Sequence, residues 1–202
     1  MDAAGSVDRV TRLIAGFAGS LSLSVPKSGT RPTSDRVREA IFSALEARDL
    51  VDGARVLDLY AGSGALGLEA ASRGAGEVTL VEKAASAARV CQANARLVEQ
   101  QAARFGVNPA PRIRVVTRAA HPAVAGLSGE LDLVFIDPPY DVADAEVTEL
   151  LVALVPHLAE DAVVALERSS RSPAPAVVAG LAQDRTATYG ETAVHWLSRD
   201  AD

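Results

Sequence analysis

The sequence predicts an α/β fold in which a mostly parallel, doubly wound sheet ends in an antiparallel hairpin. Three observations favour this fold. Short apolar stretches alternate with helical ones from residue 55 onward. These stretches are rich in Val, Leu, Ile and Phe, which is typical of parallel strands buried on both faces. A glycine-rich loop joins the first stretch to the helical segment after it.

The N-terminal part is expected to form a small β-hairpin arm. Residues 9–32 hold short apolar runs broken by Gly, Ser and Pro, and the run at 21–25 alternates with period two. A helix is expected after Thr33, Ser34 and Asp35, whose oxygens can cap it. We therefore divide the chain into an arm, residues 1–32, and a body, residues 33–202.

In the body, five strands and a terminal hairpin are expected, which makes a seven-stranded sheet. The strands are predicted at 55–60, 77–82, 112–117, 131–137 and 162–167, and those of the hairpin at 185–189 and 192–197. Helices are predicted at about 65–73, 84–104 and 144–156.

The totals indicate one globular domain of 202 residues and exclude several classes of protein. The single cysteine, Cys91, cannot form an intrachain disulfide, and we expect it to pack in a helix. No apolar run approaches the roughly 20 residues of a membrane span, so we expect a soluble, cytoplasmic protein without membrane contact. The three histidines, expected at the surface or in loops, show no metal-ligand spacing, so no metal is expected.

The charge is unevenly distributed along the chain. The net charge of −6 argues against a general nucleic-acid coat protein, yet basic residues gather between positions 9 and 38. Such a local basic arm suits contact with phosphates, although a chance cluster on a solvated surface is the alternative. The basic residues of this segment are Arg9, Arg12, Lys27, Arg31, Arg36 and Arg38.

The glycine-rich loop predicts a cofactor site. It runs from Asp58 through Tyr60, Gly62, Ser63 and Gly64 and opens a helix, and glycines let the backbone approach a ligand closely. Such a loop serves dinucleotides and S-adenosylmethionine (AdoMet) alike, and a plain strand–helix turn is the alternative to both.

Residues beside the loop favour AdoMet as the cofactor. Glu82 ends the second strand, where a carboxylate can accept both ribose hydroxyls, and Lys83 follows it as a further candidate contact. A dinucleotide brings an anion to the helix N-terminus, whereas AdoMet brings a sulfonium. The acidic Asp58 beside the loop suits the cation.

The fourth strand ends in Asp137-Pro138-Pro139-Tyr140, which predicts a catalytic site on the edge that carries the loop. Two prolines fix the backbone, so that the Asp137 carboxylate and the Pro138 carbonyl can accept from one exocyclic amine. This favours a tetrahedral nitrogen that attacks a methyl group. Tyr140 offers a ring for base stacking, and the base must be flipped or unpaired. A strand-terminating turn is the alternative.

These motifs resemble those of the RsmD-type 16S ribosomal RNA guanine-N2 methyltransferases over nearly the whole chain. The match is carried by residues 29–42, which begin Gly-Thr-Arg-Pro-Thr, by the loop at 58–70 and by 137–140, together with Asn94 and 189–192. The Thr-Arg-Pro-Thr element is the most specific, because many methyltransferases share the other two.

The resemblance implies a Rossmann-like class I AdoMet-dependent methyltransferase that acts on a guanine of 16S rRNA, in a small ribosomal subunit or its precursor, as a monomer. It implies that Gly62, Ser63, Gly64 and Glu82 hold AdoMet, that 137–140 hold the amine, and that Thr30 and Arg31 lie near the substrate opening. Arg31 and Arg36 are implied to contact phosphate or to help build the edge of the pocket. The chain departs from the family at 17–22, which carry no charge, and at Arg118, where relatives place an acidic residue or Ser. A DNA adenine-N6 methyltransferase and a non-catalytic ribosome-assembly factor remain as alternatives.

Overall fold

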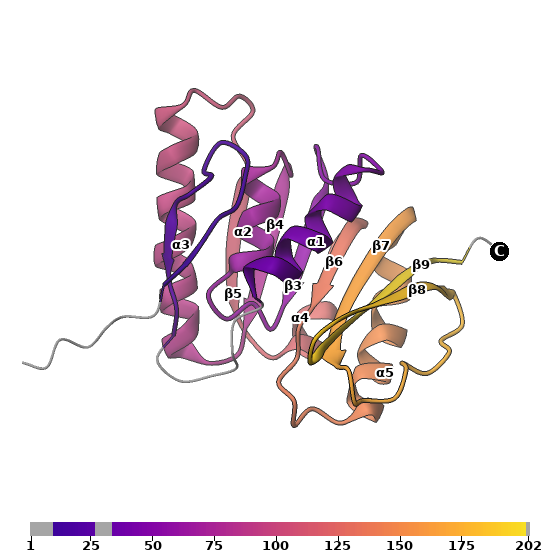
Figure 1. Ribbon diagram of the computed structural model, residues 1–202. Coiled ribbons are helices and arrows are strands. Elements are labelled where there is room, and N and C mark those ends of the chain that lie inside the picture. Colours follow the sequence, from indigo (N-terminus) through magenta and orange to yellow (C-terminus); the bar gives the residue numbers. More distant parts are fainter. Residues whose placement is uncertain (1–9, 27–33, 201–202) are drawn as a thin grey trace, which may run out of the picture.

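The computed structural model describes residues 10–26 and 34–200 and contains a seven-stranded sheet (Figure 1). The strand order is β5-β4-β3-β6-β7-β9-β8. The strands from β5 to β7 are parallel, and β9 runs antiparallel to β7 and β8. The strands are β3 (Arg55–Leu59), β4 (Glu77–Glu82), β5 (Arg112–Thr117), β6 (Leu131–Ile136), β7 (Leu158–Ser169), β8 (Leu181–Tyr189) and β9 (Thr192–Arg199). The predicted fold class is therefore confirmed.

Helices cover both faces of the sheet, each over its own apolar cluster. One cluster joins the sheet to α1 (Asp35–Glu46), α2 (Ala65–Ser72) and α3 (Ala85–Arg104). The other joins it to α4 (Ala120–Val124) and to α5 (Asp144–Leu154), which continues into the 3-10 turn η1 (Val155–His157). Alternate residues of each strand supply the two clusters, as the pleat requires. In β6, Leu133 and Phe135 face the first cluster, and Val134 and Ile136 face the second.

All eight residues of α2 are buried, and only Glu69 and Ser72 among them are polar. Its inner side packs closely on the sheet, because a Cβ at Gly67 would lie 2.3 Å from Leu80 Cδ2. Its outer side is covered by the arm. Glu69 accepts hydrogen bonds from Ile14 N at 2.7 Å and Ala15 N at 3.0 Å, so a buried carboxylate of α2 anchors the backbone of the arm.

The arm is a short hairpin of β1 (Val10–Arg12) and β2 (Ser22–Ser24), which lies beside α3 in Figure 1. In both strands only the middle residue is buried, so Thr11 and Leu23 face inward while their neighbours face outward. Leu13, Ala18 and Leu23 join the first apolar cluster with 2% exposure or less. The arm thus contributes to the core of the body. The predicted boundary at residues 32 and 33 lies outside the described residues.

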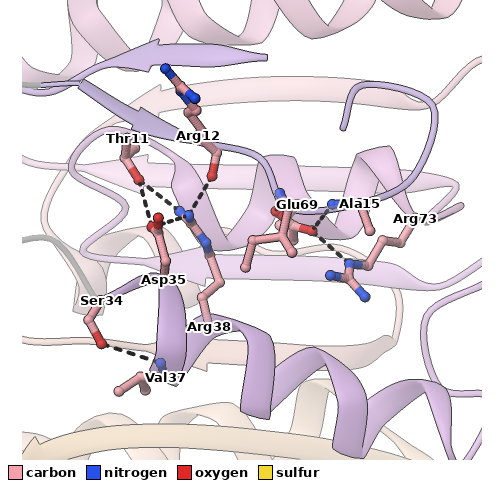
Figure 2. A network of polar contacts seen from close by, with 10 residues as sticks. Thr11, Arg12, Ala15, Ser34, Asp35, Val37, Arg38, Glu69 and Arg73 are labelled. Atoms are coloured by element: carbon pink, nitrogen blue, oxygen red, sulfur yellow. Dashed lines mark hydrogen bonds and ion pairs between the residues drawn. The ribbon is translucent and has the colours of Figure 1, made fainter. Parts of the chain in front are cut away.

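Arg38 ties the arm to α1 (Figure 2). Its side chain is fully buried and donates to the Thr11 hydroxyl at 3.2 Å, to the Arg12 carbonyl and to the Asp35 carboxylate at 2.7 Å. The basic residues of this segment were expected to be available to phosphates. This was wrong for Arg38, because its guanidinium is buried and hydrogen-bonded to other groups of the protein. Burial lowers its pKa, and the charge of Asp35 opposes that shift.

His195 also departs from expectation, because it lies inside the sheet and not at the surface or in a loop. It belongs to β9, is 4% exposed, and its Nδ1 lies 3.0 Å from the Thr186 hydroxyl of β8. Burial lowers its pKa, and the charge of Arg168 adds to the effect. The reason is topological: β8 forms the edge of the sheet, so β9 lies between two strands. Cys91 is buried in α3, as predicted, and Trp196 of β9 is buried as well.

None of the helices within 10–26 and 34–200 has the length and apolar character needed to cross a lipid bilayer.

Candidate active site

The predicted site residues gather where β3, β4 and β6 end. β3 lies between the other two strands, and Leu59 is level with Val81 of β4 and with Ile136 of β6. Because parallel strands end at the same edge, the glycine loop, Glu82 and Asp137 follow these strands side by side. The chain leaves β3 for β4 on one side and returns to β6 on the other, so this edge is the switch point of the sheet.

The glycine loop has two positions that need glycine for different reasons. Gly62 has φ +55° and Gly64 has φ +80°, a left-handed region that glycine adopts without strain. A Cβ at Gly64 would lie 2.9 Å from Cys91 Sγ, so α3 packs directly against the loop. At Gly62, the nearest described atom to such a Cβ is the Tyr60 carbonyl oxygen, 3.9 Å away. The backbone at Gly62 therefore leaves room for a ligand.

Glu82 is held between the loop and the turn after β4. One carboxylate oxygen accepts from Gly62 N at 3.0 Å, and the other accepts from Ala84 N at 2.7 Å. Two backbone donors thus fix its orientation while the residue stays partly exposed. Lys83 is exposed beside it.

Asp58 brings a buried acid to the same place. It is 2% exposed and accepts from Gly67 N at 2.9 Å. Burial raises the pKa of its carboxyl group to about 7, the Gly67 hydrogen bond opposes the shift, and the charges of Asp137 and Glu82 add to it. Three carboxyl groups therefore lie within electrostatic reach at one strand edge. A bound cation relieves their repulsion, so this donor set fits a sulfonium and an ammonium.

Asn94 of α3 supports the loop from below, and sequence reasoning gave it no role beyond a family match. It is 1% exposed, and its Nδ2 donates to the Ser63 carbonyl at 2.8 Å. The signal available was a polar amide at a position that the helical periodicity assigns to the buried face of α3. Buried amides of this kind need partners, and here the partners are backbone atoms of the loop and the arm.

The Asp-Pro-Pro-Tyr turn offers its residues to different degrees. Asp137 and Pro139 are partly exposed, and Pro138 is buried. Tyr140 is 68% exposed, so its side chain is accessible from outside the protein. The Pro139 carbonyl accepts from Val142 N at 3.0 Å, which closes the turn. Phe135 of β6 pairs with Asp58 of β3, and Asp137 follows directly after the end of β6, close enough that its charge contributes to raising the pKa of Asp58.

The remaining predicted contacts are scattered. Tyr60, at φ +62°, packs its ring against the second apolar cluster, on the α5 face, where burial raises its pKa and the charge of Glu146 adds to the effect. The role of Tyr60 as a cofactor contact therefore remains a prediction. Arg12 and Arg36 are exposed, and Figure 2 shows the Arg12 side chain directed away from the Arg38 network. Arg9, Thr30 and Arg31 lie outside the described residues. Within the described ranges, no group of three His, Cys, Asp or Glu is placed to hold a metal ion.

Comparison with known proteins gives matches over nearly the full chain. A family model described as Conserved hypothetical protein 95 matches residues 11–198. Ribosomal RNA small subunit methyltransferase D of Escherichia coli is 36% identical over 94% of this chain and 90% of that protein. Putative rRNA methyltransferase YlbH of Bacillus subtilis is 34% identical over 91% and 96%. A solved structure, the putative methyltransferase yhhF from Escherichia coli, superposes with a TM-score of 0.78 at 30% identity and covers 96% of this chain and 100% of that one.

The sheet order, the glycine loop and the Pro-Pro turn define a Rossmann-like, AdoMet-dependent methyltransferase of class I. Within that class, the chain belongs to the family described as Conserved hypothetical protein 95, the RsmD-type methyltransferases. The resemblance stated from the motifs is thereby confirmed.

Proposed function

We propose that this protein transfers the methyl group of AdoMet to the exocyclic N2 of a guanine in small-subunit rRNA. The observation that carries the proposal is the adjacency of two elements at one sheet edge: the glycine loop after β3 and Asp137-Pro138-Pro139-Tyr140 after β6. The name of the Escherichia coli relative, which specifies small-subunit rRNA, supports the choice of substrate.

The residues of the loop suit AdoMet. We propose that Gly62, Ser63 and Gly64 line the amino-acid end through their backbone, and that Glu82 accepts from the ribose hydroxyls through its outward lone pairs. Asp58 sits beneath the loop as a negative charge that a cationic ligand favours. When bound, AdoMet supplies an electrophilic methyl group on a positively charged sulfur.

The turn after β6 suits a planar aromatic amine. We propose that the Asp137 carboxylate and the Pro138 carbonyl accept the two N–H groups of N2, so that the nitrogen lone pair points out of the ring plane toward the methyl group. The exposed ring of Tyr140 stacks on the guanine and orients it. Because N2 of a paired guanine is held in the helix, the base is flipped out or already unpaired when it enters.

The setting of the reaction is also part of the proposal. We propose that the protein acts as a monomer in the cytoplasm, on a small ribosomal subunit or its precursor, and that the exposed side chains of Arg12 and Arg36 contact phosphates. Arg9, Thr30 and Arg31 remain predicted contacts of the same kind.

One experiment tests the function directly. Methyl-labelled AdoMet is offered with free small-subunit rRNA, with small subunits and with DNA, and the labelled nucleoside is identified after digestion. We expect N2-methylguanosine from one of the two ribosomal substrates and no label in DNA. N6-methyladenine in DNA would replace the proposal with the adenine alternative, and no label in any substrate would favour the non-catalytic assembly factor.

A further inference from the structure

Asn94 connects the cofactor loop with the N-terminal arm through three hydrogen bonds. Its Nδ2 donates to the Ser63 carbonyl at 2.8 Å and to the Ser24 carbonyl at 2.9 Å. Its Oδ1 accepts from Ser24 N at 3.0 Å. Both amide hydrogens and the carbonyl oxygen are therefore used, and the side chain pairs with Ser24 as a neighbouring strand would.

On the loop side, Asn94 acts on the peptide between the two functional glycines. Ser63 stands between Gly62 and Gly64, and its carbonyl is fixed from the α3 side by Asn94 while Glu82 fixes Gly62 N from the β4 side. The Ser63–Gly64 peptide is held at both its polar groups: Asn94 binds its carbonyl, and its N–H, that of Gly64, donates to the Ala61 carbonyl at 2.6 Å. Asn94 is therefore the contact from outside the loop that helps to fix this peptide of the cofactor loop.

On the arm side, Asn94 holds the last residue of β2. Ser24 pairs with Val10 of β1, and Val10 lies two positions before the exposed Arg12. Only two residues, Val25 and Pro26, separate Ser24 from the segment that contains the predicted substrate contacts Thr30 and Arg31. An anchor on Ser24 therefore fixes the end of the hairpin whose other strand carries the exposed Arg12.

We propose that Asn94 is a positioning residue shared by both sites, so that AdoMet binding and rRNA binding strengthen each other. AdoMet and rRNA each favour the arrangement in which all three hydrogen bonds are made. Whichever of them binds second then binds to a loop or an arm that is already ordered. Coupling of this kind is reciprocal. The inference rests on the proposed function, since it takes the loop as the AdoMet site and the arm as an rRNA contact.

The test measures the affinity for small-subunit rRNA with and without S-adenosylhomocysteine, which occupies the cofactor site without turnover. In the wild-type chain we expect the ligand to tighten rRNA binding about five- to tenfold, at the lower end of the usual range for coupled sites. In Asn94→Ala and in the isosteric Asn94→Asp, this factor should fall to about one. A loss of packing alone would lower both affinities but would leave the factor unchanged.

Ser24→Ala serves as a matched control, because Asn94 bonds to the backbone of Ser24 and not to its side chain. This control should retain the wild-type factor. A wild-type factor of one overturns the proposal, and so does a wild-type factor that persists in a folded Asn94 variant.

Hydrogen exchange provides a second measurement that needs no variant and no RNA. S-adenosylhomocysteine should slow exchange of the Ser24 amide in the wild-type chain, although the arm itself is not the ligand site. If rRNA proves not to be the substrate, the proposed function fails through the absence of rRNA binding and methylation. The role of Asn94 is then decided by this exchange experiment alone, and unchanged exchange at Ser24 overturns it.

Discussion

At the scale of single residues, the proposed chemistry depends on carboxyl groups that the fold gathers at one strand edge. Asp58 is buried under the loop, Glu82 is fixed by two backbone donors, and Asp137 begins the Pro-Pro turn. The same functional group thus lies in three different environments, and we propose a different task for each. Substitutions at these positions should therefore separate cofactor binding from methyl transfer.

Asp137→Ala should lower kcat by about a hundredfold or more, because it removes an acceptor that acts on the reacting amine. The affinity for AdoMet should change far less, since the residue belongs to the turn after β6 and not to the glycine loop. Calorimetry gives the affinity, and transfer of labelled methyl groups gives kcat. Equal losses of affinity and turnover would argue against the assigned role.

Glu82→Ala should weaken AdoMet binding by about ten- to a hundredfold, the range for loss of a hydrogen bond to a charged group. Calorimetry measures the dissociation constant. Glu77→Ala is the matched control, because Glu77 begins the same strand at the opposite edge, where it pairs with Arg55 and Arg112. An unchanged dissociation constant in Glu82→Ala would refute the ribose assignment.

Affinity for AdoMet should rise as the pH increases through about 7, because the cationic ligand favours ionised Asp58, whose pKa is raised to about 7. Binding near pH 7 should release part of a proton, measured by calorimetry in buffers of different ionisation enthalpy. Asp58→Asn should abolish this release.

The same group affects the stability of the free protein in the opposite direction. The folded state holds the Asp58 proton up to about pH 7, whereas the unfolded chain loses it near the ordinary value of 3.8. The contribution of this group to stability is therefore present at low pH and decreases as the pH rises from about 4 to about 7. A free energy of unfolding whose pH slope is the same in Asp58→Asn would contradict the assignment.

At the scale of elements, the helices of one face and the arm act as a single support. α2 is enclosed between the sheet and the arm, and α1 is tied to the arm by Arg38. Short strands such as β1 and β2 have little stability of their own. Their position therefore depends on buried polar anchors supplied by α1, α2 and α3.

Arg38→Met should lower the free energy of unfolding by about 2–4 kcal/mol, because it leaves buried oxygens of Thr11 and Arg12 without their donor. Urea denaturation measures the change. Arg36 lies two residues before Arg38 in α1 and is exposed, so Arg36→Met should change the free energy of unfolding by less than about 0.5 kcal/mol. Equal stabilities of the two variants would show that the Arg38 network does not hold the arm.

The element pattern was largely predictable from periodicity, and the departures have physical causes. The helix predicted at 84–104 is α3, one residue shorter. β7 and β8 each begin four residues before their predicted starts, because their first halves carry exposed polar residues that hide the apolar signal. α4 was not predicted, since five residues with a proline and no side-chain cap give no periodic signal.

The site was predictable only where residues adjacent in the sequence form it. The glycine loop and the Pro-Pro turn are recognisable from short stretches of sequence, and both follow strands that end at the same edge of the sheet. Glu69 and Asn94 were not recognisable in this way, because the arm residues that they hold lie 54 to 70 positions away in the sequence, and Ser63, the loop partner of Asn94, lies 31 positions away. A buried polar residue shows in the sequence that a partner is needed but not which one.

At the scale of the whole molecule, an acidic protein with a net charge of −6 is expected to bind RNA through one limited face. Affinity for small-subunit rRNA should fall as salt rises, and Arg12→Ala should reduce the slope of log K against log salt by about 0.7–0.9. Fluorescence anisotropy across a salt series measures both. An unchanged slope in Arg12→Ala would show that the Arg12 side chain does not contact the RNA phosphates.

The alternation along β1 and β2 divides the arm into two sets of positions under separate demands. Inward positions such as Thr11 and Leu23 are constrained by packing. The side chains of outward positions such as Val10, Arg12 and Ser22 are constrained only by the molecules that the protein binds. Under the proposed function, substitutions in the outward set would therefore change which RNA is bound while the scaffold keeps its shape. Within the uncharged stretch at 17–22, only Gly19, Ser20 and Ser22 are exposed and share this freedom, because Ala18 belongs to the apolar core.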